Sequence, residues 1–177
     1  MGDTRDKLLE AKYFLEQMKL NESNREAFRY NLSAFLSAAR SVTFIMQNEF
    51  SQVSGFKEWY NEKGANMKTD SSMKFLNDKR VMSIHLEQIR PHAKATVSLT
   101  ARIKTNVSIS ALIKRTNGTV ERLEPVAETN APPSTETPPP TARWRWYFDE
   151  IPDKDVVTLG LEYIGKLEAL VAEWESR

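Results

Sequence analysis

The stretch from residue 24 to residue 51, NREAFRYNLSAFLSAARSVTFIMQNEFS, predicts a long helix at the centre of the fold. Its large apolar residues alternate between spacings of four and three, which is the pattern of a helix with one packed face. These residues are Phe28, Leu32, Phe35, Ala39, Val42 and Met46. Asn21 or Ser23, just ahead of the stretch, can cap its N-terminus. The small residues beside the stripe let a neighbouring helix approach closely, so the stretch predicts a helical bundle.

Three more segments show helical periodicity, at residues 4–20, in the region 71–90 and from Pro152 to the C-terminal end. The second of these helices should be capped by Asp70 or Ser71 and should end before Pro91, because the residue before a proline avoids the α region. We expect its apolar stripe to be Phe75, Met82, Leu86 and Ile89. The expected stripe of the C-terminal helix is Val157, Leu161, Ile164, Leu167, Val171 and Trp174. The residues around 55–70 predict a short helix and a loop, with a patch for helix packing or dimer formation.

Between the helical segments the apolar period changes from helical to alternating. Residues 95–125 and 142–149 predict strands of an antiparallel sheet, with Asn117–Gly118 in a tight turn. The loop 126–141 is rich in proline, threonine and glutamate and should be exposed. The predicted fold is therefore mainly α: an up-down four-helix bundle with an antiparallel β hairpin or sheet inserted between the third helix and the C-terminal helix. The bundle domain should comprise residues 1–93 and 150–177, and the inserted segment residues 94–149.

Composition excludes several classes of protein. The chain has 177 residues with 40% hydrophobic and 28% charged residues, a net charge of +1 and no cysteine. These values fit one globular domain and exclude a disulfide scaffold or a cysteine-ligated metal. A nearly neutral chain is a poor non-specific coat for nucleic acid, although a local phosphate site remains compatible with it. With no signal peptide, membrane span or metal-ligand pattern in the sequence, we expect a cytoplasmic protein without metal or cofactor.

The candidate catalytic residues lie together in the helix before the insertion. Arg80 and His85 are five residues apart, with Asp78, Asn77 and Ser83 as supporting polar groups. On a straight helix Arg80 and His85 point about 140° apart, so they can meet only through a bend or a second subunit. The alternative is that Arg80 is a surface cation and His85 lies at the edge of the core. The other histidine, His92, follows a proline and should be an exposed loop residue.

The segment FLNDKRVMSIH, residues 75–85, and the C-terminal WYFDEIPDKDVVTLGLEYIGKLEALV, residues 146–171, resemble the HEPN superfamily of small helical bundles. The signature of that family is an arginine followed after four to six residues by a histidine, and many members are metal-independent ribonucleases. The resemblance implies a HEPN-like bundle and a homodimer whose paired motifs face one cleft. It also implies a toxin or defence effector that cleaves RNA, with a cognate inhibitor protein as a further partner.

In that chemistry the 2′-hydroxyl of RNA attacks the adjacent phosphate, His85 transfers protons and Arg80 stabilises the charge that develops. The dimer would supply the second histidine that separate acid and base roles need. Val81 stands where the family usually has a polar residue, and it favours the alternative of a non-catalytic HEPN-like binding or scaffold protein whose β insertion recognises a partner.

The segment RWRWYF, residues 143–148, mixes cations with aromatic rings, a combination that suits contact with RNA or a partner protein. The side chains concerned are Arg143, Arg145, Trp144 and Trp146. The other interpretation is an ordinary strand, with Trp144, Trp146 and Phe148 on the packed face and the arginines in solvent.

Overall fold

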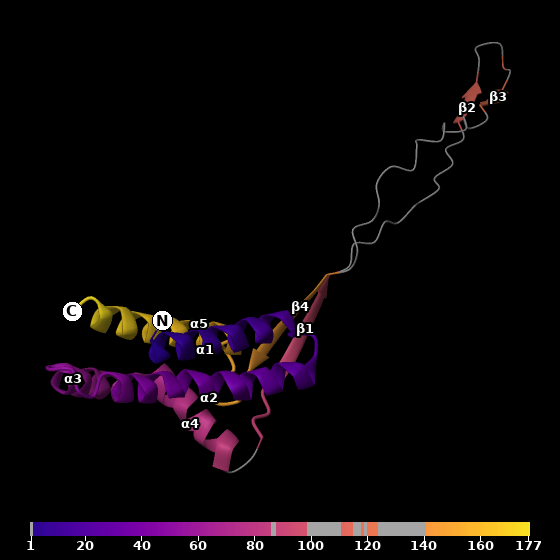
Figure 1. Ribbon diagram of the computed structural model, residues 1–177. Coiled ribbons are helices and arrows are strands. Elements are labelled where there is room, and N and C mark those ends of the chain that lie inside the picture. Colours follow the sequence, from indigo (N-terminus) through magenta and orange to yellow (C-terminus); the bar gives the residue numbers. More distant parts are fainter. Residues whose placement is uncertain (1, 86–87, 99–110, 115–117, 119, 124–140) are drawn as a thin grey trace. The chain divides into compact units, whose positions relative to one another are not determined.

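The computed structural model describes residues 2–85, 88–98, 111–114, 118, 120–123 and 141–177 (Figure 1). The chain divides into two compact units, a bundle unit of residues 1–96 and 143–177 and an insert unit of residues 97–142. The described residues form five helices: α1 (Asp3–Leu20), α2 (Arg25–Glu49), α3 (Phe56–Thr69), α4 (Ser71–His85) and α5 (Val156–Glu175). The prediction of a mainly helical fold is confirmed; besides the four helices of the predicted bundle, the fifth helix is α3, in the segment predicted as a short helix and a loop.

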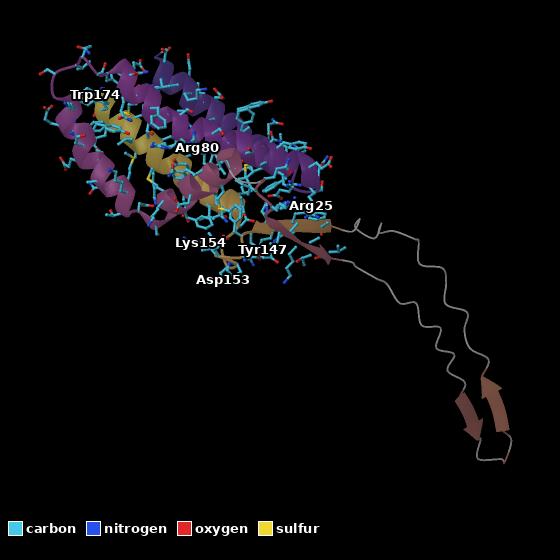
Figure 2. All side chains as sticks on the ribbon, turned by 90° about the horizontal axis from the view of Figure 1, so that it is seen from below. Arg25, Arg80, Tyr147, Asp153, Lys154 and Trp174 are labelled. Carbon is cyan, nitrogen blue, oxygen red and sulfur yellow. The ribbon has the colours of Figure 1, made fainter. Side chains whose placement is uncertain are left out.

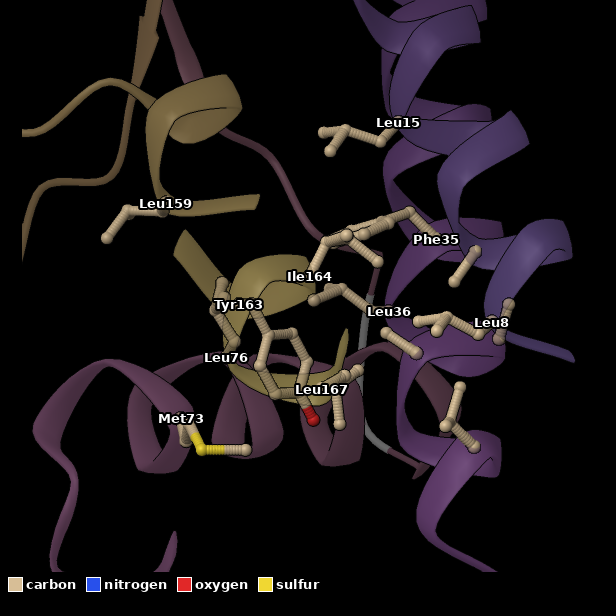
Figure 3. Packing of buried hydrophobic residues seen from close by; sticks show 14 of the residues in the cluster. Leu8, Leu15, Phe35, Leu36, Met73, Leu76, Leu159, Tyr163, Ile164 and Leu167 are labelled. Carbon is tan, nitrogen blue, oxygen red and sulfur yellow. The ribbon is translucent and has the colours of Figure 1, made fainter. Parts of the chain in front are cut away.

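The long helix predicted around residues 24–51 is α2, and it lies at the centre of the bundle unit. Asn24 caps it: the side chain accepts a hydrogen bond from the backbone N–H of Ala27 at 3.1 Å. All six residues of the predicted stripe are fully buried. They pack against α1, α4 and α5 in a single hydrophobic core, part of which is shown in Figure 3. The cap is one residue later than Ser23, but the helix and its packed face follow the prediction.

Helix α5 packs closely against α1 and α2. Asp155 caps its N-terminus by accepting hydrogen bonds from the backbone N–H groups of Val157 and Thr158. A Cβ atom at Gly160 would lie 2.6 Å from Leu15 Cδ1, so a larger residue here would require the Leu15 side chain to shift. The predicted stripe is wrong at Leu161, which is exposed, whereas Tyr163 is buried in the core.

The predicted short helix and loop at residues 55–70 is instead one helix, α3. Its buried side chains, Phe56 and Trp59, pack against Trp174 of α5, with ring centroids 4.9 and 5.1 Å from the Trp174 ring. The indole N–H of Trp59 also donates to Glu173 Oε1 at 2.9 Å. This aromatic patch therefore holds α3 on α5 within one chain.

Asp70 joins α3 to α4 and ties both to α5. Its Oδ1 accepts hydrogen bonds from the backbone N–H of Met73 and the hydroxyl of Ser72, and its Oδ2 accepts one from Lys166 Nζ at 2.5 Å. The bond from Lys166, and after it the bond from the Met73 amide, hold the pKa of Asp70 well below its ordinary value. A carboxylate with a lowered pKa stabilises the folded state only while it is ionised.

We expect Asp70→Asn to lower the free energy of unfolding by about 1–2 kcal/mol at neutral pH, because the amide still caps α4 but loses the charge that Lys166 faces. The contribution of Asp70 is fully present above the pKa of an unfolded aspartate, about 3.9, and is lost as the pH falls through the lower folded-state pKa. Urea unfolding of both proteins at neutral and acid pH measures this. A difference between wild type and variant that persists undiminished at about pH 2 would contradict the role given to Asp70.

Helix α4 buries a different face from the predicted one. Its buried residues are Ser72, Met73, Leu76 and Lys79, whereas Phe75 is half-buried. Lys79 is buried because its ammonium donates to Glu150 Oε1 at 2.6 Å and lies near the rings of Phe75 and Phe148. The helix ends at His85, residues 86–87 lie outside the described residues, and residues 88–91 are not helical.

Two pairs of strands follow. β1 (His92–Ser98) and β4 (Thr141–Tyr147) form a two-stranded sheet and run in opposite directions (Figure 1). In the insert unit, β2 (Ala111–Lys114) and β3 (Val120–Leu123) form an antiparallel hairpin, with Ala111 opposite Leu123 and Lys114 opposite Val120. Gly118 has a φ of 89°. The predicted strand residues 99–110, Asn117 and residues 126–140 of the predicted loop lie outside the described residues. His92 lies in a strand, so the loop prediction for it is wrong.

Within the described residues, no helix combines the length and the apolar composition that crossing a membrane requires.

Candidate functional site

Arg80 lies on the inner side of α4, because it stands seven residues after the buried Met73 (Figure 2). The side chain is half-buried, and its Nε atom is buried with no hydrogen-bond partner among the described residues. Arg80 also lies near Tyr163 of α5. Burial raises the pKa of Tyr163, while the charges of Arg40 and Arg80 oppose that shift. Arg80 is therefore a half-buried cation of the bundle unit, with its Nε atom inside and part of the side chain in solvent.

His85 is the last residue of α4, and its side chain lies outside the described residues. The structure therefore shows no geometry for an Arg80–His85 pair. RNA cleavage by these two residues remains an untested prediction, and so does the homodimer that it requires.

The three supporting residues are placed differently from one another. Asn77 and Asp78 line a cavity between the helices. Ser83 faces α2 instead, and its hydroxyl lies 2.9 Å from the hydroxyl of Ser33, so it joins two helices.

The first polar feature of the bundle unit is this cavity, which Asn77 and Asp78 help to line. It has a volume of about 610 Å³ and is lined by α2, α3 and α4, with Tyr163 contributed by α5. Its ionisable side chains are Arg40, Tyr60, Lys68, Lys74, Asp78 and Tyr163. Sequence reasoning missed all of these except Asp78, since they come from four helices and no local spacing links them.

The second polar feature is the two-stranded sheet of β1 and β4, which we call the ribbon. Every residue of β1 is exposed, and so are the first three residues of β4 and Arg145. The strands carry three cations, Lys94, Arg143 and Arg145, and no carboxylate. Arg145 donates to the backbone oxygen of Pro152 and lies over the ring of Tyr147. Lys94 and Arg143 have no carboxylate partner among the described residues.

The base of the ribbon is anchored in the helical core through Trp146. Its ring is 1% exposed and stacks on Phe28 of α2, with centroids 4.2 Å apart and planes within 7°. The indole N–H donates to the backbone oxygen of Glu22 at 2.9 Å, and the backbone N–H of Trp146 donates to Asp155 Oδ2. Trp146 is therefore a core residue, and the prediction that it contacts RNA or a partner is wrong. Trp144 is half-buried and retains exposed surface.

Beside Trp146, the ribbon has a polar junction with the loop before α5. The imidazole of His92 stacks on Tyr147, with ring centroids 5.6 Å apart, and its Nε2 lies 3.0 Å from Asp149 Oδ2. His92 is thus held on the ribbon, in a different element from Arg80.

The fold and these features define a mainly helical protein with an exposed basic ribbon. The family model described as bacteriophage lambda protein ea47 matches residues 4–99, which is more than half of the chain. The chain therefore belongs to this family. It is similar to Protein ea47 of Escherichia phage lambda, with 53% identity over 36 residues. That segment is 20% of this chain and spans only 9% of the relative. No solved structure matches the chain.

The family match overturns the HEPN resemblance, which is wrong. The reason is that an arginine and a histidine five residues apart form a short pattern that arises by chance in many amphipathic helices. The toxin and defence roles rested on the resemblance and are withdrawn with it.

Proposed function

We propose that this protein binds nucleic acid, and that the ribbon of β1 and β4 contacts the phosphate backbone. The observation that supports this proposal is the charge of the ribbon. Two seven-residue strands carry Lys94, Arg143 and Arg145 without a carboxylate, and all of β1 is exposed. The charge balance of the whole chain, with 25 basic and 24 acidic residues, makes such a local excess of cations informative.

The shape of the ribbon also suits a duplex. A two-stranded β-ribbon fits the major groove of B-form DNA, whereas the major groove of an RNA duplex is too deep and narrow for side chains to read. Lysine and arginine side chains that reach phosphates from the ribbon supply affinity that does not depend on sequence. Duplex DNA is therefore the ligand that we expect to bind, and single-stranded RNA serves as the comparison ligand in the binding experiment.

The anchoring of the ribbon supports the proposal as well. An isolated two-stranded hairpin is only marginally stable in water, so an exposed ribbon needs support at its base. Trp146 and Phe148 supply it, since both are buried in the helical core. A ribbon held rigidly at one end loses less conformational entropy on binding than a free loop does.

The proposal predicts where nucleic acid acts on the protein. We expect a short DNA duplex added to the ¹⁵N-labelled protein to shift the backbone amide resonances of β1 and β4, because the bound phosphates change the local electrostatic environment. The amide resonances of α3, which carries no part of the ribbon, should not shift. Shifts confined to α3 and α5, or no shift with either duplex DNA or single-stranded RNA at low salt, would contradict the proposal.

A further inference from the structure

The cavity between α2, α3 and α4 contains an arginine that is already oriented and has no carboxylate partner among the described residues. Arg40 donates from Nη1 to the hydroxyl of Thr43 at 2.6 Å, and its guanidinium lies over the ring of Phe44, 4.2 Å from the centroid. These two contacts fix the plane of the guanidinium but leave other N–H groups available. Planar guanidinium groups match the paired oxygens of phosphate and carboxylate groups.

Two tyrosine hydroxyls lie in the same cavity and feel the same arginine. Tyr60 accepts a hydrogen bond from Gln47 Nε2 at 3.1 Å, and Tyr163 reaches the cavity from α5. Burial raises the pKa of both phenols; a hydrogen bond with Thr43 and then the charge of Arg40 oppose the shift at Tyr60, and the charge of Arg40 opposes it at Tyr163. Both hydroxyls are therefore protonated at neutral pH and able to donate to an anion beside Arg40.

The charge of the cavity indicates which anion it suits. Arg40, Lys68 and Lys74 line it with Asp78 as the only carboxylate among the lining residues, so three positive charges less one negative charge leave an excess of two. A phosphate monoester carries about 1.5 to 2 negative charges at neutral pH, whereas a carboxylate carries only one. The charge therefore favours a phosphate monoester.

The remaining lining suits the rest of a nucleotide. The side-chain amides of Asn61 and Asn77 offer both donors and acceptors, as the edge of a nucleobase requires, and Met67 and Met73 offer adaptable apolar surface for its faces. The volume of about 610 Å³ lies within the range of sites that hold small molecules.

We propose that this cavity binds a nucleoside monophosphate, with the phosphate on Arg40 and the hydroxyls of Tyr60 and Tyr163 and the base between α3 and α4. This site uses none of the residues of the ribbon. Its occupancy is therefore independent of whether the ribbon binds nucleic acid.

Calorimetric titration of the full chain with each of the four common nucleoside monophosphates tests the proposal. Adenosine and inorganic phosphate, titrated separately, report the two halves of one ligand. At least one nucleoside monophosphate should bind, and removing its phosphate should weaken binding at least about tenfold, as expected for a lost charge-assisted contact. Binding by none of the four at millimolar concentration, or equal affinity for adenosine and its monophosphate, would overturn the proposal.

Arg40→Gln should weaken binding of the monophosphate by about 10- to 100-fold while leaving the affinity for the nucleoside unchanged. Arg25→Gln is the matched control, because it removes the same charge from an exposed position on the same helix. Tyr60→Phe provides a variant that keeps the ring and its packing, and it should lose affinity severalfold while a melting curve shows that it remains folded. Equal losses for Arg25→Gln and Arg40→Gln, or no loss for both Arg40→Gln and Tyr60→Phe, would show that the cavity does not hold the phosphate.

Discussion

Replacing Trp146 with alanine should lower the free energy of unfolding by about 3–5 kcal/mol, the range seen when a buried aromatic side chain is truncated. Three losses combine in this variant. The core loses a side chain that is 1% exposed, Phe28 loses its stacked partner, and the backbone oxygen of Glu22 loses its donor. Since proteins of this size are typically stable by only about 5–15 kcal/mol, a loss of this size is a large part of the total.

Urea unfolding followed by circular dichroism measures this effect, and Trp144→Ala is the control. Trp144 lies two residues away on the same strand but is only half-buried, so its removal should cost about 1 kcal/mol or less. Trp146→Phe, which keeps a ring beside Phe28 and loses the hydrogen bond, should fall between the two. Equal effects of the alanine variants at 144 and 146 would show that the ribbon is not anchored as the structure has it.

Sequence patterns were sufficient to predict α2 and the strand that carries Trp146. In α2 the stripe from Phe28 to Met46 keeps a regular spacing of four and three over about five turns, and this regular spacing predicted the packed face although Tyr30 and Phe44 lie outside it and are exposed. In residues 143–148 the strict alternation of arginine with tryptophan predicted which side enters the core, and the burial of Trp146 and Phe148 follows that pattern.

Helix α4 shows where such patterns fail. Apolar residues occur all around it, at Met73, Phe75, Leu76, Val81 and Met82, so more than one stripe was compatible with the sequence. The face that is buried includes Lys79, because Glu150, 71 residues away in the chain, accepts its hydrogen bond. No local spacing contains that partner.

The cavity was missed for the same reason. Arg40, Tyr60 and Tyr163 come from three helices that are far apart in sequence, and each has an ordinary helical neighbourhood. The only local signal was Arg40 itself, a cation placed between the buried Ala39 and Val42 of the α2 stripe. The Arg80–His85 spacing is visible in the sequence because the two residues are close in the chain. A pattern this short arises often by chance, so it said little about function.

The double substitution Lys94→Gln with Arg143→Gln should weaken binding of a short DNA duplex by about tenfold or more at low salt. Each lost phosphate contact removes a charge-assisted interaction together with the release of a counterion. Neither side chain has a carboxylate partner among the described residues, and both are exposed, so the variant should remain as stable as the wild type. The binding is measured by fluorescence anisotropy, and melting curves verify the fold.

A variant with the same change in net charge separates a specific ribbon contact from a general charge effect. Lys7→Gln with Lys57→Gln removes two lysines from α1 and α3, and Lys7 lies beside Asn48 and Glu49, at the opposite end of α2 from the Phe28 on which Trp146 stacks. This control should bind the duplex almost as well as the wild type, because charges separated from the contact by more than about 10 Å are largely screened at moderate ionic strength. Equal losses in the two double variants would show that the ribbon is not the binding surface.

The dependence of duplex affinity on salt concentration reports how many phosphates the ribbon contacts. The logarithm of the binding constant should fall linearly with the logarithm of the salt concentration, with a slope of about −0.9 for each phosphate contacted. We expect the Lys94→Gln, Arg143→Gln variant to have a slope about two units shallower than wild type, while the Lys7→Gln, Lys57→Gln variant keeps the wild-type slope. An unchanged slope in the ribbon variant, or wild-type binding that does not respond to salt, would contradict the proposed contact.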